Sequence, residues 1–473
     1  MGWLHAIDGE STASLSGARL LLDQLESCGR VDPLSIGGQF TAIAYHRKTS
    51  HLVCIRDLAG SYPLHAGVGD EGKSLYLASD IRQVSAGQRR PLSLNLAALR
   101  RMQDCFELPA PATPYHGILQ SPPGQTFRIE NPAQWRPPDC RQLIPALAAR
   151  VNQPPAALPS DEALIAYTHA AIEDSMRAAF DTPDCFVSLS GGMDSNLLML
   201  QARRVQPAVR AVSCSFPGRT CDESDIVRKH PGDQIEIVPF ATPQFDQWKD
   251  ELFSRTDYVP FPASQVGLQA ALRASQLGAR YFFNGNGGDE LFDWHVRHLA
   301  LSSHALAHLR LIASLSRDQS LQDSAKLAAR ILISTVQRII SPEKPRAQLA
   351  AKLFTNQHRY MFYLAAEQLH ASAGMEARAP YRDFALARKL APLMPLASFL
   401  GHRRRGLQAV LIERLSQGRI KLDRAMKKSY DEFASIQGLN PHPLLGATRR
   451  DHFAGLLPAF IEFKTQREGL GLY

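Results

Sequence analysis

Long apolar runs are absent from this chain. No stretch reaches the roughly 18 uninterrupted apolar residues that a membrane-spanning helix needs, so no membrane association is expected. An acidic residue, Asp8, comes too early for a secretory signal peptide. The seven cysteines include no C-x-x-C pair, which disfavours a zinc site. These absences predict a cytoplasmic protein with reduced thiols.

Basic charge is present but spread out. The 53 Lys and Arg residues outnumber the 45 Asp and Glu residues, giving a net charge of +8. The densest cluster, HRRR at residues 402–405, is short, and no known nucleic-acid-binding module appears. A triphosphate or an acidic peptide would use the same charge, and we expect no nucleic-acid partner. With 473 residues, the chain is long enough for two or three domains.

A strand–turn–helix pattern at residues 185–203 predicts an anion-binding site. Apolar CFV leads into the turn SLSGG, and MDSNLLMLQAR continues with helical spacing. Glycines let the backbone approach an anion, and the N–H groups at a helix start face it. The turn has neither the Gly-Lys-Ser/Thr of a Walker loop nor a dinucleotide fingerprint. Asp194 adds an oxygen ligand for Mg²⁺, although a Gly/Ser turn without function is the alternative.

The letters SGGMDS at residues 190–195 resemble the pyrophosphate loop of the ATP-pyrophosphatase superfamily, whose members split ATP into AMP and pyrophosphate. The resemblance implies ATP and Mg²⁺ as cofactors. The nucleotide-binding residues that it implies are Ser190, Gly191, Gly192, Asp194 and Ser195.

A second glycine-rich turn follows an aromatic strand at residues 281–292 (YFFNGNGGDELF). It predicts a second bend at the same sheet edge, where Asp289 could share one Mg²⁺ with Asp194. A helix start with its acids facing the helix dipole is the alternative. Together the two turns resemble the asparagine synthetase superfamily, which favours metal binding by Asp289 and nucleotide contacts by Gly287 and Gly288.

The chain departs from that superfamily at Asn286, three residues before Asp289. Asparagine synthetases generally carry Glu there, and β-lactam synthetase carries a catalytic Tyr. An amide cannot act as a general base at neutral pH, so neither mechanism transfers through this residue.

Residues 374–383 (GMEARAPYRD) resemble the E-x-R-x-P-[FY]-x-D segment that closes the synthetase site of the superfamily. The resemblance implies that Glu376 orients or deprotonates the attacking amine and that Arg378 supports it. An ion pair that merely holds the segment in place is the alternative.

Residues 423–430 (DRAMKKSY) resemble the superfamily loop that keeps a lysine for the charge of the transition state. The lysine is doubled here, so Lys428 is the first candidate and Lys427 the second. A solvated pair of surface lysines is the alternative.

The first 130 residues read as mostly β-strands and resemble the glutaminase domain of class B asparagine synthetases. The resemblance rests on GGQF (residues 37–40), RDLAGSYPL (residues 56–64) and LASDI (residues 77–81). That domain needs a cysteine directly after the initiator Met as its nucleophile, whereas Gly2 stands here. The resemblance therefore implies an inactive glutaminase-like domain.

The expected fold is α/β. A β-rich, glutaminase-like sandwich of the Ntn type, lacking its nucleophile, spans residues 1–130. A proline-rich linker follows at residues 131–159. Residues 160–473 form an ATP-pyrophosphatase-type synthetase domain, because strands alternate with helices as in a parallel sheet. Added helices are expected at about residues 296–373.

This layout resembles two enzymes with a dead amino-terminal domain, β-lactam synthetase and the lasso peptide cyclases. The resemblance implies adenylation of an Asp or Glu side chain in a precursor peptide and attack by the peptide's own terminal amine. A precursor peptide is then the main partner, with a leader peptidase or leader-binding protein of the same pathway as a further candidate. Ammonia-dependent asparagine synthesis and amide closure in a small molecule are the alternatives.

The glycine at position 2 yields the first prediction. No acyl-enzyme can form without a nucleophilic side chain, so the purified protein should release no ammonia from glutamine. Glutamine-dependent ammonia release above that of a heat-denatured sample would contradict the inactive-domain hypothesis.

Overall fold

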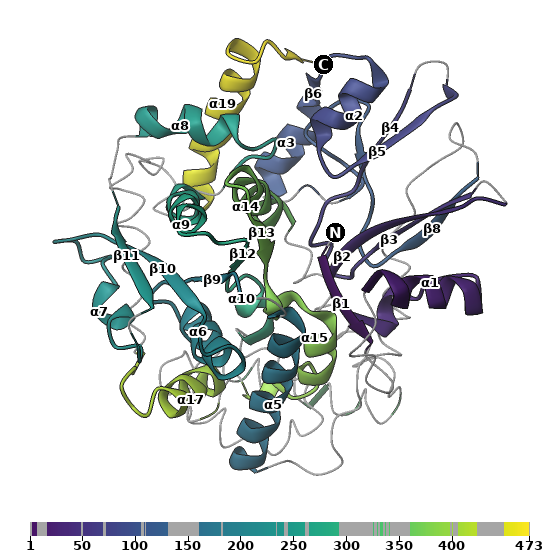
Figure 1. Cartoon of the computed structure of the whole chain (residues 1–473). Coiled ribbons are helices and arrows are strands. Elements are labelled where there is room, and N and C mark those ends of the chain that lie inside the picture. The colour runs from purple at the N-terminus through teal and green to yellow at the C-terminus, as the bar shows by residue number, and fades with distance from the viewer. Residues whose placement is uncertain are drawn as a thin grey trace.

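The computed structural model contains two sheet-based parts (Figure 1). It describes residues 2–6, 17–48, 51–69, 72–105, 108, 110–130, 160–180, 183–232, 234–240, 245–260, 264–292, 325, 329, 332–333, 336, 340, 360–397, 400, 405–422 and 449–472.

The amino-terminal part is a sandwich of antiparallel strands in the orders β1-β2-β3-β8 and β5-β4-β7. Its strands are β1 (Gly2–Ala6), β2 (Ile36–His46), β3 (His51–Arg56), β4 (His65–Val68), β5 (Leu75–Ala78), β7 (Leu119–Gln120) and β8 (Thr126–Ile129). Buried Cys54 and Ile129 of one sheet pack with Ala66 of the other. Helix α1 (Gly17–Cys28) adds Leu21 to the outer side of the first sheet, where it packs with Phe40. The predicted β-rich sandwich is confirmed.

The second part is built on a parallel sheet of order β11-β10-β9-β12-β13. Its strands are β9 (Cys185–Ser188), β10 (Arg210–Ser215), β11 (Ile235–Pro239), β12 (Tyr281–Phe283) and β13 (Glu376–Arg378). Val187 packs on the side of α5 (Asp161–Ala179) and α6 (Met193–Val205), whereas Phe186 packs on the side of α9 (Ser264–Gln276). A strand covered on both faces is apolar throughout, which explains the CFV run. The predicted parallel α/β domain is confirmed.

Helix α5 has a capped amino-terminal end. The Ser160 hydroxyl accepts a hydrogen bond from the Ala163 N–H at 3.2 Å, and Asp161 and Glu162 lie in the first turn. A capping hydroxyl and acidic residues both stabilise a helix start.

Further described elements complete the two parts. They are α2 (Ile81–Gln88), β6 (Ser93–Leu94), α3 (Leu96–Cys105), α7 (Ser224–Val227), α8 (Phe245–Ser254), α10 (Gly288–Phe292), α14 (Tyr360–Ser372), α15 (Phe384–Leu390), α16 (Met394–Ala397), α17 (Gly406–Leu415), α19 (Arg449–Gln466) and β14 (Gly471–Leu472). Within the described ranges, no helix is long and apolar enough to cross a membrane. The expected linker at residues 131–159 lies outside the described residues, as does most of the expected helical stretch at 296–373.

The two parts share a hydrophobic core. Ile81 and Leu99 of the amino-terminal part belong to one buried cluster with Trp248 of α8 and Phe460 of α19. The carboxyl-terminal helix α19 therefore packs beside α3 and α8, as Figure 1 shows. Burial of this apolar surface stabilises the contact between the two parts.

Buried hydrogen bonds also join the amino-terminal part to β13 and to the segment after it. The Gln39 side-chain oxygen accepts the Ala379 N–H at 2.7 Å, and the Asp383 carboxylate accepts the Gly38 N–H at 2.8 Å. The Tyr62 hydroxyl donates to the Ala377 carbonyl at 2.8 Å. Because buried polar groups are costly to leave unpaired, these bonds fix the segment against the first part.

Candidate active site

The first glycine-rich loop joins β9 to α6. The Ser195 hydroxyl accepts the Ser190 N–H at 3.0 Å, and the Asn196 side-chain amide donates to the Ser190 and Gly192 carbonyls at 3.0 and 2.7 Å. Gly192 is the N-cap of α6, and no side chain in the described part of the chain caps the amides there. The first N–H groups of a helix lack partners within it, so those at the start of α6 are available to an anion.

Buried His230 contacts Asn196, the residue whose side chain bridges two carbonyls of this loop. The His230 Nε2 atom lies 2.6 Å from the Asn196 side-chain oxygen. Burial lowers the pKa of His230 to about 4, so the ring is neutral at pH 7. Asn196 therefore keeps one orientation, with its amide hydrogens on the loop carbonyls. Sequence reasoning missed both residues, although Asn196 directly follows the loop motif.

The second glycine-rich loop lies against the first. β12 pairs with β9, with Phe283 opposite Val187, so both loops leave the same sheet edge. A Cβ atom on Gly285 would lie 2.9 Å from the Asp194 Cβ, and one on Gly288 would come closer still to the Asp194 carboxylate. Only glycine allows the backbone of the second loop to come this close to Asp194. This requirement explains why the second motif has glycines at positions 285 and 288.

The carboxylates of Asp194 and Asp289 meet at one positive charge. The Arg405 guanidinium contacts Asp194 through Nη2 and Asp289 through Nη1, the latter at 3.0 Å. The Gln408 amide also donates to Asp194 at 2.7 Å. Burial, with Asp289 nearby, raises the pKa of Asp194 to about 7 despite the attraction of Arg405. Two acids this close favour a shared cation.

This arrangement fits Mg²⁺. The ion binds through one or two carboxylates and takes phosphate oxygens and water as its other ligands. Among the described residues, no group of three or more His, Cys, Asp or Glu side chains could form a closed metal site. Asp194 and Asp289 would hold the ion beside the phosphates, with Arg405 supplying positive charge to the same place.

Glu376 lies away from these acids. It begins β13 opposite Tyr281, which in turn pairs with Cys185, so Glu376 is at the amino ends of the strands. The two loops leave from the carboxyl ends. Its carboxylate accepts hydrogen bonds from Arg378 at 3.1 Å and from Tyr62 at 3.2 Å. The geometry favours the ion-pair alternative, and contact of Glu376 with the attacking amine stays a prediction.

Residues beyond β13 reach the loops instead. The Tyr381 hydroxyl donates to the Asp194 carbonyl at 3.3 Å. A Cβ atom on Gly287 would lie 2.6 Å from the Arg382 Cγ. The third motif thus touches the site through its second half. Asn286 is half-buried in the second loop, and its N–H is held by the Asn284 side chain at 3.1 Å.

The two candidate lysines, Lys427 and Lys428, lie outside the described residues. Arg405 is a basic group that the structure does bring to the acids. Arg405 belongs to the HRRR cluster at residues 402–405, and the composition of that cluster did not indicate which group in the protein it contacts.

A cavity of about 100 Å³ flanks the first loop. Its walls include Ser190 and Gly191 of the loop, Ser213 of β10 and Glu223 before α7. It opens at the carboxyl ends of β9 and β10, which is where parallel sheets bind ligands.

Two protein-family models match the chain. The asparagine synthase model matches residues 169–407, just over half of the chain. The chain belongs to the asparagine synthase family. A glutamine amidotransferase domain model matches residues 5–136 of this asparagine synthase family protein. No curated protein matches it. Membership makes the protein an ATP-dependent ligase that adenylates a carboxylate, forms an amide and releases AMP.

The contacts of Asn196 generate a prediction for this asparagine synthase family protein. Asn196→Ala removes the contact with His230 and the two hydrogen bonds to the loop carbonyls, which contribute about 1 kcal/mol each, so kcat/KM for ATP should fall by roughly 10- to 100-fold. Pyrophosphate release measures the effect, and Gln276→Ala on an exposed turn of α9 is the control. An Asn196→Ala enzyme with wild-type kcat/KM would refute the positioning role.

Proposed function

We propose that this asparagine synthase family protein closes a macrolactam in a lasso peptide precursor. It adenylates an Asp or Glu side chain, and the amino-terminal amine of the same peptide displaces AMP to form an isopeptide bond. The observation that carries the proposal is a glutaminase-like domain without its nucleophile, joined to a synthetase domain that retains both of its acidic loops. Ammonia from glutamine is then unnecessary, because the substrate brings its own amine.

The state of the amino-terminal domain supports this reaction. Gly2 begins strand β1, which pairs with β2 through Gly2 and Phe40, so the strand persists although the cysteine expected there is missing. Cys54, also in this domain, is fully buried, and burial raises its thiol pKa to about 12. A thiol of that pKa is a poor nucleophile at neutral pH.

The proposed chemistry assigns roles along the two loops. Ser190, Gly191, Gly192 and Ser195 bind the ATP phosphates, together with Gly287 and Gly288 of the second loop. Bound Mg²⁺ would supply charge neutralisation at the phosphates, held by Asp194 and Asp289.

The substrate carboxylate attacks the α-phosphorus, which gives an acyl-adenylate and pyrophosphate. The neutral amine then attacks the acyl carbon, AMP leaves, and one proton is released. Lys428 or Lys427 is proposed to stabilise the transition-state charge. Since Asn286 cannot act as a base, orientation of the amine contributes more than proton transfer. A leader peptidase or leader-binding protein remains a proposed partner.

Mass spectrometry with synthetic precursor peptides tests this function. Each peptide carries a free amino terminus and one Asp or Glu, placed at successive positions along the set. With ATP and Mg²⁺, the active peptide should lose the mass of one water while AMP and pyrophosphate form in equal amounts. Asp194→Ala should abolish AMP formation, and Asp184→Ala, an exposed acid before β9, should not.

Other products would contradict the proposal. Free asparagine made from aspartate and ammonium would identify an asparagine synthetase. AMP release that depends on added tRNA would identify a nucleic-acid-modifying enzyme. Unchanged ATP cleavage in Asp194→Ala would remove the assigned role of the first loop.

A further inference from the structure

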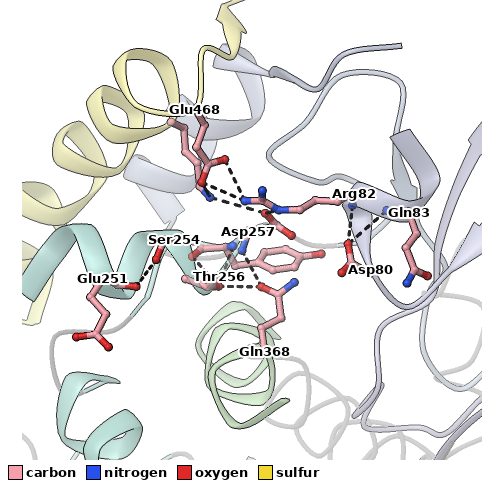
Figure 2. Close-up of polar contacts among 11 residues, drawn as sticks. Asp80, Arg82, Gln83, Glu251, Ser254, Thr256, Asp257, Gln368 and Glu468 are labelled. Atoms are coloured by element: carbon pink, nitrogen blue, oxygen red, sulfur yellow. Dashed lines mark hydrogen bonds and ion pairs between the residues drawn. The ribbon is translucent and has the colours of Figure 1, made fainter. Parts of the chain in front are cut away.

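A cavity of about 440 Å³ lies between the two domains. The amino-terminal domain contributes Tyr62 and Arg82, and the synthetase domain contributes residues 254–257 and the inner side of α14 with the start of β13. Figure 2 shows Arg82 facing Asp257 from across this junction, with Gln368 of α14 below them. Its volume falls within the roughly 300–1,000 Å³ that is usual for ligand sites.

The walls of this junction cavity are acidic. Four carboxylates line it, from Asp80, Asp257, Glu367 and Glu376, against two guanidinium groups, from Arg82 and Arg255. The guanidinium of Arg82 is already paired with Asp257 and with Glu468, both at 3.0 Å (Figure 2). Three of the four carboxylates are paired, Asp257 with Arg82, Glu376 with Arg378 and Glu367 with Arg382. A ligand of complementary chemistry must therefore be sought at the carboxylate oxygens that these pairs leave over.

One of the two carboxylate oxygens of Glu367 is available to bind a ligand. Its side chain is 12 % exposed, and one carboxylate oxygen accepts a hydrogen bond from Arg382 at 2.9 Å. The other oxygen, Oε2, is buried and has no hydrogen-bond partner among the described residues. An unpaired buried carboxylate oxygen is unfavourable, and an ammonium group, which donates three hydrogen bonds, would satisfy it.

The Glu367 carboxylate connects the cavity to the nucleotide site. Its partner Arg382 also donates to the Ala59 carbonyl at 2.7 Å and packs against Gly287 of the second loop. Helix α14 precedes β13 by a short turn and lies alongside it, so the wall runs from Glu376 toward Glu367. The end of the cavity at Glu367 is therefore one side chain away from the loop that carries Asp289.

We propose that the junction cavity binds the amine-bearing end of the peptide substrate. The terminal ammonium is held by Glu367 and loses one proton to water before the neutral amine attacks the acyl carbon. The next residues of the peptide lie along the wall that the amino-terminal domain supplies. This inference rests on the proposed macrolactam synthesis and extends it by assigning a place to the nucleophile. It also gives the inactive domain a present role, as one wall of a substrate site.

Filling the cavity tests the assignment without breaking an ion pair. Ala371 is an exposed residue of α14 on the cavity wall, and Ala371→Phe would occupy the space. Ala166→Phe, on an exposed position of α5, is the matched control. Peptide-dependent ATP–pyrophosphate exchange and ring formation should both stay within about twofold of wild type in Ala166→Phe. Ring formation should fall roughly tenfold or more in Ala371→Phe alone, the scale of one hydrogen bond to a charged group.

Binding without ATP separates this inference from the proposed function. Each synthetic peptide is compared with the same peptide acetylated at its amino terminus, and the free amine should bind roughly tenfold more tightly to the wild type and to Ala166→Phe. Glu367→Gln and Ala371→Phe should remove that preference. Equal affinity for both forms in the wild type, or normal ring formation by Ala371→Phe, would overturn the cavity assignment. Amine-dependent binding with no AMP formation would instead overturn the proposed function alone.

Discussion

The close approach of two glycine-rich loops is the constraint on which this site depends. Without Cβ atoms at Gly285 and Gly288, the backbone of the second loop can lie against Asp194. Two carboxylates from segments about one hundred residues apart in sequence then contact the same guanidinium, that of Arg405. Arg405 supplies the positive charge that stabilises these like charges, and the same pair of carboxylates fits a Mg²⁺ ion beside phosphate oxygens.

The same constraint gives the glutaminase-like domain a structural role. Segment 379–383 touches the first loop through Tyr381 and the second through Arg382. The amino-terminal domain in turn holds that segment through Gln39 and Gly38. Loss of the domain would leave several buried polar groups unpaired next to the nucleotide loops. The domain therefore supports the synthetase site.

Much of this organisation could be predicted from the sequence, because strand, turn and helix signals are local. The strand before Ser188 and the glycine-rich turn after it follow from patterns within a few residues. The meeting of Asp194 with Asp289 follows from the rule that the loops after parallel strands lie at one edge of the sheet. Other contacts between segments that are distant in the sequence could not be predicted from local patterns. The register of β13 places Glu376 at the amino ends of the strands, opposite to the end where the two loops lie. No local sequence signal indicated that His230 contacts Asn196 or that Arg405 contacts Asp194.

The central claim is that Asp194 and Asp289 hold one ion. Its most direct test is Mn²⁺ titration, with a non-hydrolysable ATP analogue present, of the wild type, Asp194→Asn, Asp289→Asn and the double variant. Shared coordination predicts that the double variant loses little more affinity than the weaker-binding single variant, because the first substitution already dismantles the site. Additive losses of binding free energy would show that the two acids act independently, and would contradict the account.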